Sequence, residues 1–319
     1  MKPVLFTLFG LEVPAYFAML AIGFSLATWI GARWLGALGH DREVVVDLGL
    51  AMVIAGVLGS RVLHVLADGY FWDYVHLCTD PSKVDWHISE AHCRAASVDG
   101  VWDAARRVCH PKEANCFAWA AFWAGGLTYY GGLIGAVGYA WWFLRREGFP
   151  FWKAADMSGF AIALGLTWGR MGCFLAGCCF GVRAHGPWAV SFPPWSPASE
   201  TQFRAGLLPS EQVASLPVHP TQLYESVGCL LIGAVAYLAI APRKRFDGQV
   251  FLFFLGAYSA LRFAVEYLRN DDRGGMLGLS TSQLISVAIV ALIPLAWRRL
   301  AARASEPEGD VRPEVQGHG

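Results

Sequence analysis

The stretch MSGFAIALGLTWGRMGCF, residues 157–174, contains one charged side chain, Arg170, among 18 residues. A helix needs about 20 mainly apolar residues to cross the hydrocarbon core of a bilayer, and this run with its apolar neighbours reaches that length. A charged group at bilayer depth costs at least about 2.5 kcal/mol, so an arginine there indicates a function. The sequence therefore predicts a membrane helix that carries a functional arginine.

The composition as a whole agrees with a membrane protein. Of the 319 residues, 55% are hydrophobic and 16% are charged, and the mean hydropathy is +0.40. About a quarter of the residues of a soluble domain are usually charged. The 25 basic and 25 acidic residues cancel, so no basic excess indicates a nucleic-acid partner. We expect an all-α integral membrane protein that contacts membrane lipid.

Seven apolar runs are predicted to cross the membrane, and residues 1–300 are expected to form one transmembrane helical domain. The third run is rich in glycine at its start, so its helix is expected to begin near Gly131. The polar tail, residues 301–319, is expected to be disordered. The runs cover residues 14–32, 48–66, 117–144, 157–174, 223–241, 250–268 and 276–297.

Basic residues gather in every second connection, after the first, third, fifth and seventh runs. Because short cytoplasmic loops carry the excess of lysine and arginine, these connections and the C-terminus are predicted to be cytoplasmic and the N-terminus to be outside. Two long segments, residues 67–116 and 182–220, then lie on the extracytoplasmic side. No cleavage site follows the first residues, so no removed signal peptide is expected.

The first of these long segments contains four cysteines. Four thiols in one extracytoplasmic loop favour two disulfides, whose pairing the sequence leaves open. A metal site is the alternative, because four histidines lie in the same segment, but no tight Cys-x-x-Cys spacing supports it. The cysteines are Cys78, Cys93, Cys109 and Cys116, and the histidines are His76, His87, His92 and His110.

Three arginines, Arg61, Arg170 and Arg262, lie inside predicted spans. In the predicted orientation all three fall in the outer halves of their helices. Residues 125–132, which open the third span, and residues 219–225, which open the fifth, lie at the same level. Anchoring of arginines to headgroups at helix ends is the simplest alternative. It does not suit Arg170, which has apolar residues on both sides.

The arginines indicate the class of ligand. Glu266 follows Arg262 by four residues, so an ion pair within one helix is expected. Guanidinium groups at headgroup depth suit the phosphate of a phospholipid. Glycines at Gly131 and Gly132 would let a lipid or a backbone approach closely, and a helix start would present free N–H groups to an anion. These residues predict a headgroup site without naming a reaction.

Four motifs in a fixed order carry a family resemblance. They are GGLTYYGGLIG at residues 125–135, GRMGCFLAG at 169–177 running on to Gly181, HPTQLYE at 219–225 and RFAVE at 262–266. Each motif alone is weak, but their order and their places at helix ends are specific. With these motifs the chain resembles the prolipoprotein diacylglyceryl transferases over nearly its whole length, excluding the cysteine-bearing segment and the tail.

The resemblance implies a reaction at the bacterial cytoplasmic (inner) membrane, near its extracytoplasmic face. The diacylglyceryl group of phosphatidylglycerol passes to the lipobox cysteine thiol of a prolipoprotein, next to its signal peptide, and glycerol phosphate leaves. This is the first step of lipoprotein maturation. Charge grows on the departing phosphate, which arginines held in advance would stabilise. No metal and no organic cofactor is needed.

The resemblance also assigns residues. Arg170 matches the arginine associated with binding phosphatidylglycerol. Arg262 matches a second essential arginine, with the acidic Glu266 one turn later, and Tyr16 matches a family tyrosine. Together with the placement of the other polar residues and glycines, the resemblance leads us to expect catalytic roles for Arg262, Tyr130 and Glu266. Phosphatidylglycerol binding is expected for Arg170, Arg61, Tyr16, Gly131, Gly132, Gly181 and His219.

The chain departs from the family pattern. Tyr130 stands where the family has a histidine, and a phenol with a pKa of about 10 is a poorer base at neutral pH. Cys173 and Cys178 stand where the family has an asparagine and an acidic residue, and Cys179 follows them. These thiols could be packing residues, a redox pair, a metal site or direct participants. The alternative functions are a family paralogue with a different acceptor and a thiol-redox or lipid-binding membrane protein.

Overall fold

The computed structural model describes residues 4–8, 11–88, 90–94, 98–122, 126, 128–269, 275–276 and 278–305. Most of these residues are helical, and six of the helices are long and apolar enough to cross a membrane. The prediction of an all-α multi-pass membrane protein is confirmed, and the described residues add short two-stranded hairpins. The six helices are α1 (Ala15–Ala37), α2 (Glu43–Ala67), α6 (Phe151–Ala176), α8 (Thr221–Val235, continuing to Arg243), α9 (Gln249–Glu266) and α10 (Thr281–Ser305).

The third predicted span, residues 117–144, forms a long helix only in its later part, as its glycine-rich start predicted. Its helix, α5, runs from Tyr129 to Arg146, and residues 118–120 form only one 3₁₀ turn. The expected start near Gly131 agrees to within two residues. Two tyrosines at the start of α5 and two arginines at its end leave it less apolar than the six helices above, so a seventh span stays a prediction. Gly125 lies outside the described residues.

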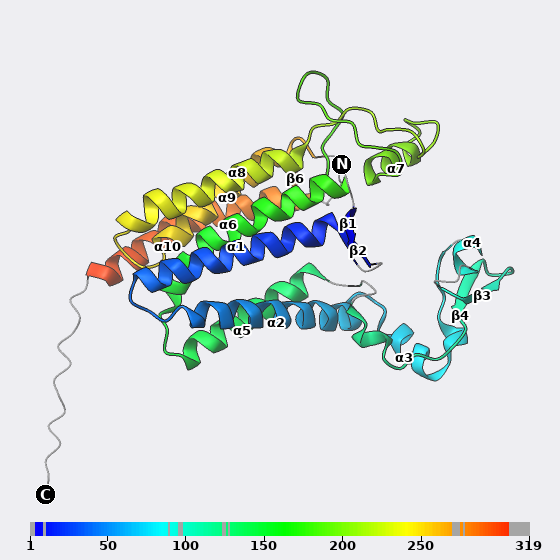
Figure 1. Cartoon of the computed structure of the whole chain (residues 1–319), viewed down its shortest axis with the longest axis horizontal. Coiled ribbons are helices and arrows are strands. Elements are labelled where there is room, and N and C mark those ends of the chain that lie inside the picture. The colour runs from blue at the N-terminus through cyan, green and yellow to red at the C-terminus, as the bar shows by residue number, and fades with distance from the viewer. Residues whose placement is uncertain are drawn as a thin grey trace, which may run out of the picture. The chain divides into compact units, whose positions relative to one another are not determined.

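The chain forms two compact units, residues 1–45 with 149–319, and residues 46–148. In the first unit α6 is central: it packs against α1, α8 and α9, and α10 packs against α9 (Figure 1). Because α6 has neighbours on several sides, 33% of its apolar stretch is buried, against 11% of that of α10. The helix that carries Arg170 is therefore the core of this unit.

Small residues let these helices approach one another. A Cβ at Gly23 of α1 would lie 2.9 Å from the Cβ of Trp168 on α6. A Cβ at Gly159 of α6 would lie 3.2 Å from the carbonyl oxygen of Val250 on α9. Membrane helices have little hydrophobic drive to associate with one another, so close packing through such residues supplies much of their attraction.

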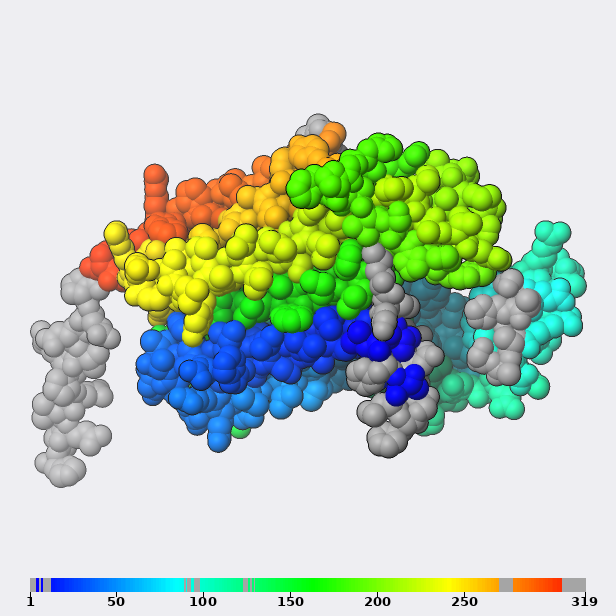
Figure 2. All heavy atoms as spheres, turned by 45° about the horizontal axis from the view of Figure 1, so that its top comes forward, coloured from blue at the N-terminus to red at the C-terminus, as the bar shows by residue number. Residues whose placement is uncertain are grey.

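The segment between α6 and α8, residues 177–220, gathers at one end of the first unit's helices (Figure 2). It holds one short helix, α7 (Pro197–Arg204), capped by the Ser196 side chain. We call this end the Arg170 end, and the opposite end, where α8 stops and α9 begins, the Asp156 end. The buried side chains of the segment form a core of their own: Phe180, Phe192, Ala198 and Val218.

A buried carboxylate fixes the start of α9 at the Asp156 end. Oδ1 of Asp156 accepts hydrogen bonds from the backbone N–H groups of Val250 (2.9 Å) and Phe251 (3.2 Å), and Oδ2 accepts one from Nζ of Lys244 (2.8 Å). The first N–H groups of a helix lack partners within it, so this side chain of another helix serves as their cap. Burial alone would lower the pKa of Lys244, but the carboxylates of Asp156 and Asp247 raise it.

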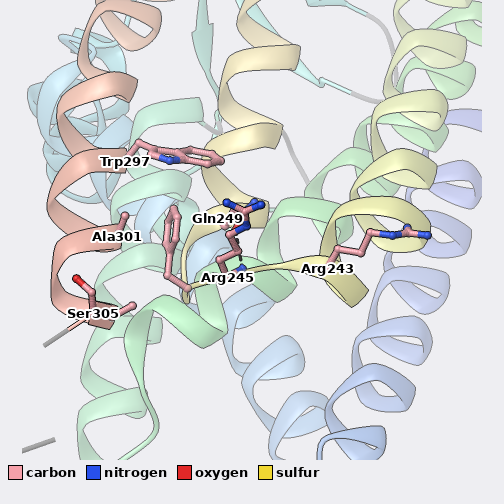
Figure 3. A pocket seen from close by; sticks show the side chains of 8 residues that line it. Arg243, Arg245, Gln249, Trp297, Ala301 and Ser305 are labelled. Carbon is pink, nitrogen blue, oxygen red and sulfur yellow. Dashed lines mark hydrogen bonds between the residues drawn. The ribbon is translucent and has the colours of Figure 1, made fainter. Parts of the chain in front are cut away.

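A hollow of about 490 Å³ lies at the same end, between α10 and the connection from α8 to α9 (Figure 3). The backbone N–H of Arg245 donates to Oε1 of Gln249 at 2.7 Å, and the Arg243 side chain extends away from Trp297. Basic and aromatic side chains together are typical of the interface between a membrane and water. The lining residues are Arg243, Arg245, Phe246, Gln249, Trp297, Ala301, Ala304 and Ser305.

In the second unit α2 and α5 lie side by side (Figure 1). A Cβ at Gly131 would lie 2.4 Å from the carbonyl oxygen of Gly59, and one at Gly135 would lie 2.3 Å from that of Ala55. Any larger residue at these two positions would force the helices apart. The glycines of α5 are therefore what allows this helix pair to form.

The cysteine-bearing segment of the second unit holds two disulfides. They join Cys78 to Cys116 and Cys93 to Cys109, which supplies the pairing that the sequence left open. Among the side chains described in this segment, no group is arranged to hold a metal ion, so the structure supports the disulfides rather than the alternative. The segment contains α3 (Phe71–Thr79), α4 (Glu90–Cys93), β3 (Gly100–Asp103) and β4 (Val108–Pro111).

Candidate active site

A buried ion pair lies at the Arg170 end, where α6, α8 and α9 meet. Nη2 of Arg170 lies 3.0 Å from Oε1 of Glu225, and the hydroxyl of Tyr258 donates to the same oxygen at 3.0 Å. The Glu225 side chain is 1% exposed and that of Arg170 is 17% exposed. A carboxylate this deep requires a cation beside it, so Glu225 fixes the position of the guanidinium that the sequence singled out.

Acceptor atoms without partners lie beside this pair. Within the described parts of the chain, Oε2 of Glu225 and Oε1 of Gln222 are buried and accept no hydrogen bond. Nε2 of Gln222, by contrast, donates to the carbonyl oxygen of Cys178 at 2.7 Å. A buried polar group without a partner costs about 1–3 kcal/mol. This cost marks the surroundings of Arg170 as a candidate binding site.

Arg262 and Glu266 form the ion pair that their spacing predicted. Nη2 of Arg262 lies 2.6 Å from Oε2 of Glu266 and donates to Oγ of Ser282, at the start of α10, at 3.2 Å. Nη1 of Arg262 is buried and has no hydrogen-bond partner among the residues described. Tyr258, Arg262 and Glu266 follow one another at four-residue spacing and so share one face of α9. Because Tyr258 also contacts Glu225, this face connects the two ion pairs.

Three cysteines follow Arg170 and converge on one point. The Sγ atoms of Cys173, Cys178 and Cys179 all lie within 4.8 Å of one another. The chain turns back because Gly177, directly after α6, has a φ of +76° and because Cys179 has a φ of +61°. The left-handed conformation is uncommon for a residue with a side chain and costs energy. We call these residues the cysteine turn.

The start of α8 and Arg269 hold the cysteine turn in place. Oγ1 of Thr221 donates to the carbonyl oxygen of Cys179 at 2.9 Å. Hydrogen bonds with the thiols of Cys173 and Cys178, and a further one from Arg269, lower the pKa of the Cys179 thiol. Residues from α8 and from the segment after α9 therefore hold Cys179 in place.

Tyr16, near the start of α1, lies beside the cysteine turn. A Cβ at Gly172 of α6 would lie 3.1 Å from Cδ2 of the Tyr16 ring. The phenol is close enough to Arg170 and to all three cysteines to interact with them electrostatically. The structure thus brings Tyr16 and Arg170 together, although they are far apart in the sequence.

Gly181 and His219 lie where two connecting segments cross. The backbone N–H of Gly181 donates to the carbonyl oxygen of His219 at 2.9 Å. A Cβ at Gly181 would lie 2.3 Å from the carbonyl oxygen of Leu268, so only glycine fits. Nδ1 of His219 lies 3.2 Å from the hydroxyl of Tyr224. These contacts give both residues a part in forming the Arg170 end.

Arg61 belongs to the second unit. Its side chain is largely buried and donates to the carbonyl oxygens of Ala118 and Trp119, each at 2.7 Å, and of Gly126, at 3.2 Å. Its guanidinium carbon also lies 5.2 Å from the ring centroid of Tyr74. Arg61 therefore fastens the loop that precedes α5, and its expected contact with phosphatidylglycerol stays a prediction.

The glycine motif and Tyr130 also belong to the second unit. Gly131 and Gly132 were expected to let either a lipid or a backbone approach closely. The structure shows the approach of a backbone, because a Cβ at Gly132 would lie 3.4 Å from the carbonyl oxygen of Gly56. Tyr130 is 62% exposed. Its expected role as a base stays a prediction.

Sequence reasoning gave no site role to Glu225, Tyr258 or Gln222. Tyr258 precedes Arg262 by four residues, which is a usable signal for residues that share a helix face. Gln222 lies inside the motif at residues 219–225, but nothing in that motif indicates that its amide would reach the cysteine turn.

The sequence matches the family of prolipoprotein diacylglyceryl transferases over residues 3–88 and 105–298. Three proteins named phosphatidylglycerol–prolipoprotein diacylglyceryl transferase are similar along most of their length. They come from Clostridium tetani (strain Massachusetts / E88), Vibrio atlanticus (strain LGP32) and Nitratidesulfovibrio vulgaris (strain DP4), and are 26%, 27% and 28% identical. Each alignment covers 92% of this chain and 95%, 90% and 90% of the respective relative.

The family match includes α6, α8 and α9, which carry the two ion pairs, and leaves out residues 89–104 of the disulfide-bonded segment. The parts of the chain that build the candidate site are thus shared with the family, and an insertion lies elsewhere. This chain belongs to the prolipoprotein diacylglyceryl transferase family, and it is a multi-pass membrane protein.

Proposed function

We propose that this chain transfers the diacylglyceryl group of phosphatidylglycerol to the cysteine thiol of a prolipoprotein lipobox and releases glycerol phosphate. The family match and the names of the three relatives support this reaction. The observation that carries the proposal is the Arg170–Glu225 pair, a guanidinium held by a buried carboxylate within a membrane helix. A guanidinium fixed in this way suits a phosphodiester headgroup.

The reaction joins the thiol sulfur to a glyceryl carbon while the bond from that carbon to a phosphate oxygen breaks. The electron pair of the broken bond stays on the phosphate, and the thiol proton is lost to solvent. Because negative charge grows on the phosphate, a cation held in advance stabilises the transition state more than the bound substrate. Arg170 is such a cation, since Glu225 and Tyr258 fix its position before substrate binds.

Arg262 is the second phosphate-binding group in this proposal. Its Nη2 is engaged by Glu266 and Ser282, whereas its buried Nη1 has no hydrogen-bond partner in the described part of the chain. A phosphate oxygen would supply the missing acceptor. Glu266 then acts as a positioning residue for Arg262, as Glu225 does for Arg170.

We assign the Arg170 end to the extracytoplasmic face of a bacterial cytoplasmic membrane. An excess of lysine and arginine is typical of cytoplasmic connections, and the Asp156 end has that excess. The disulfide-bonded segment, which follows α2, would then lie in an oxidising compartment, where disulfides persist. The basic residues at the Asp156 end are Arg243, Lys244, Arg245, Arg298 and Arg299.

The test is a transfer assay with the purified chain in vesicles that contain phosphatidylglycerol and a lipobox peptide. Mass spectrometry of the peptide measures the added diacylglyceryl group. Arg170→Ala should lower the rate by about 10²–10³-fold, the effect of removing one preorganised electrostatic group. Arg204→Ala is the matched control, because Arg204 is exposed on α7 and pairs only with Glu200 among the described residues. Full activity of Arg170→Ala contradicts its role, and no transfer by the unmodified chain contradicts the function.

The cysteine turn favours one other candidate, a thiol-redox membrane protein, because its three sulfurs converge. In that case replacing Cys173, Cys178 and Cys179 together with serine would abolish the function, and Arg170→Ala would matter little. For the transferase, by contrast, Arg170→Ala should strongly lower the activity. The same set of variants therefore distinguishes the two functions.

A further inference from the structure

The cysteine turn brings together three thiols that the chain does not use for disulfides. The four cysteines of the second unit are paired, whereas Cys173, Cys178 and Cys179 are free although their sulfurs lie within 4.8 Å of one another. A dithiol switch would need two of them and leave the third without a role. A metal ion would use all three.

The spacing of the sulfurs suits a metal ion. Zinc binds cysteine sulfur at about 2.3 Å, which places the sulfurs of a tetrahedral site about 3.8 Å apart. Thiols already within 4.8 Å reach that separation through small side-chain rotations. Among all the described residues, this is the one group of histidine, cysteine and acidic side chains with such spacing.

The backbone of the turn is fixed by partners from another helix. The carbonyl oxygens of Cys178 and Cys179 accept hydrogen bonds from Gln222 and Thr221, and both donor residues are at most 1% exposed. Cys179 is held in a left-handed conformation, with a φ of +61°. Groups that hold ligand residues in this way prepare a site for its ion.

The chemistry of the ligands selects the class of ion. Three sulfur ligands suit a thiophilic ion such as Zn²⁺ and do not suit Mg²⁺ or Ca²⁺, which prefer oxygen. Three thiolates and one Zn²⁺ carry a net charge of −1. Arg269, which hydrogen-bonds Cys179, and Arg170, which interacts electrostatically with Cys173 and Cys179, offset that charge.

We propose that Cys173, Cys178 and Cys179 bind a zinc ion through three thiolates and leave its fourth position to the acceptor thiol. The role of the fourth position rests on the proposed function. Catalytic zinc sites keep three protein ligands and one open position for a reactant, and a thiol that coordinates zinc loses its proton. The site would thus activate the lipobox thiol in a chain that has Tyr130 where a histidine base was expected.

The S–H bond of the lipobox cysteine breaks, its proton goes to solvent, and the sulfur binds the zinc ion. The sulfur then forms a bond to the glyceryl carbon, the carbon–oxygen bond to the phosphate breaks, and the electron pair stays on the phosphate beside Arg170. No electrons are gained or lost overall. The neutral thioether product is a weaker ligand than a thiolate, and it leaves the ion.

The test measures metal content and transfer on the same preparations of the full chain in detergent. After loading with zinc and removal of unbound metal, elemental analysis should find stoichiometric zinc in the parent chain. Cys173→Ser, Cys178→Ser and Cys179→Ser should lose it. Cys229→Ser is the matched control, since Cys229 is a buried free cysteine outside the turn, and it should keep the zinc. Cys179→His, which retains a zinc ligand, should keep more zinc than Cys179→Ser and separates lost ligation from misfolding.

Cobalt replaces zinc as a spectroscopic probe, and thiolate-to-cobalt charge-transfer absorption should appear in the parent chain and disappear in the three serine variants. Chelation should abolish transfer, and zinc should restore it. Full transfer by a chain that binds no zinc, or a disulfide between two of the three cysteines in the active chain, overturns the inference while the proposed function stands. Zinc bound by the three cysteines without any diacylglyceryl transfer overturns the proposed function and leaves the metal site intact.

Discussion

The two ends of the first unit each contain a buried carboxylate paired with a cation, and they differ in how completely that carboxylate is satisfied. At the Asp156 end, one oxygen of Asp156 binds Lys244 and the other caps two backbone N–H groups of α9. At the Arg170 end, one oxygen of Glu225 holds Arg170 and Tyr258. The other oxygen of Glu225 has no partner among the residues described.

This difference indicates that Asp156 stabilises the fold, whereas Glu225 belongs to the candidate site. A buried charge with every acceptor satisfied strengthens the surrounding structure and needs no other molecule. A buried carboxylate oxygen without a hydrogen-bond partner costs about 1–3 kcal/mol. In proteins such unfavourable groups are found mainly at functional positions. We therefore expect changes at Asp156 to act on stability and changes at Glu225 to act on transfer.

The largest expected effect is on stability, at Asp156. Asp156→Ala removes two caps of α9 and leaves Lys244 without its buried partner, so it should lower the free energy of unfolding by about 3–5 kcal/mol. Unfolding in mixed micelles, followed by circular dichroism, measures the change. Transfer per folded molecule should stay near that of the parent, and loss of transfer without loss of stability would erase the proposed distinction between the two ends.

Asp247→Ala is the control for this change. Asp247 pairs with the same lysine but is 38% exposed, and an exposed ion pair contributes at most about 1 kcal/mol. An equal loss of stability in both variants would show that the charge of Lys244, rather than the capping of α9, is what matters at this end.

The next effect is on transfer, at Glu225. Glu225→Gln keeps the size of the side chain and an acceptor for Tyr258 but removes the charge that holds Arg170. The rate per folded molecule should fall by about 10²-fold, as for other preorganised electrostatic groups. Glu200→Gln, at an exposed carboxylate on α7, should leave the rate unchanged. A loss of stability with an unchanged rate would make Glu225 the counterpart of Asp156.

Apolar runs predicted the membrane helices because a helix in lipid must satisfy its own backbone, but they misplaced several helix ends by a few residues. The helix with Arg170 was expected over residues 157–174 and spans Phe151–Ala176. Its first turns include Lys153 and Asp156, which a search for apolar residues excludes. They are accommodated there because Asp156 finds Lys244 and the start of α9, neither of which is near it in the sequence.

The two ion pairs at the site show the same limit. Arg262 and Glu266 lie one turn apart on one helix, so their spacing predicted the contact. Arg170 and Glu225 lie on different helices, and a single sequence does not indicate which helix faces meet. The sequence therefore marked both Arg170 and the motif containing Glu225 as important but could not pair them.

A smaller effect is expected at Tyr258. Tyr258→Phe removes the hydroxyl that donates to Glu225 and keeps the ring, so the carboxylate loses a second anchor but not its cation. One hydrogen bond to a charged group contributes about 1.5–3 kcal/mol. We expect the turnover rate to fall about tenfold, which corresponds to loss of the lower end of that range in the transition state. Tyr237→Phe, on the continuation of α8, is the control. A change in stability alone would make the hydroxyl part of the fold.

The smallest expected effect is at Tyr130, in the second unit, and it tests whether the chemistry depends on the Arg170 end alone. A phenol has a pKa of about 10, so it is a weak base at neutral pH, and Tyr130 is exposed. Tyr130→Phe should lower the rate less than about twofold, because activation by the cysteine turn takes the place of a base. The transfer assay measures this directly. A fall in the transfer rate of about 10²-fold, the usual contribution of general base catalysis, would show that Tyr130 acts as the base. Activation of the thiol by the cysteine turn would then not be needed.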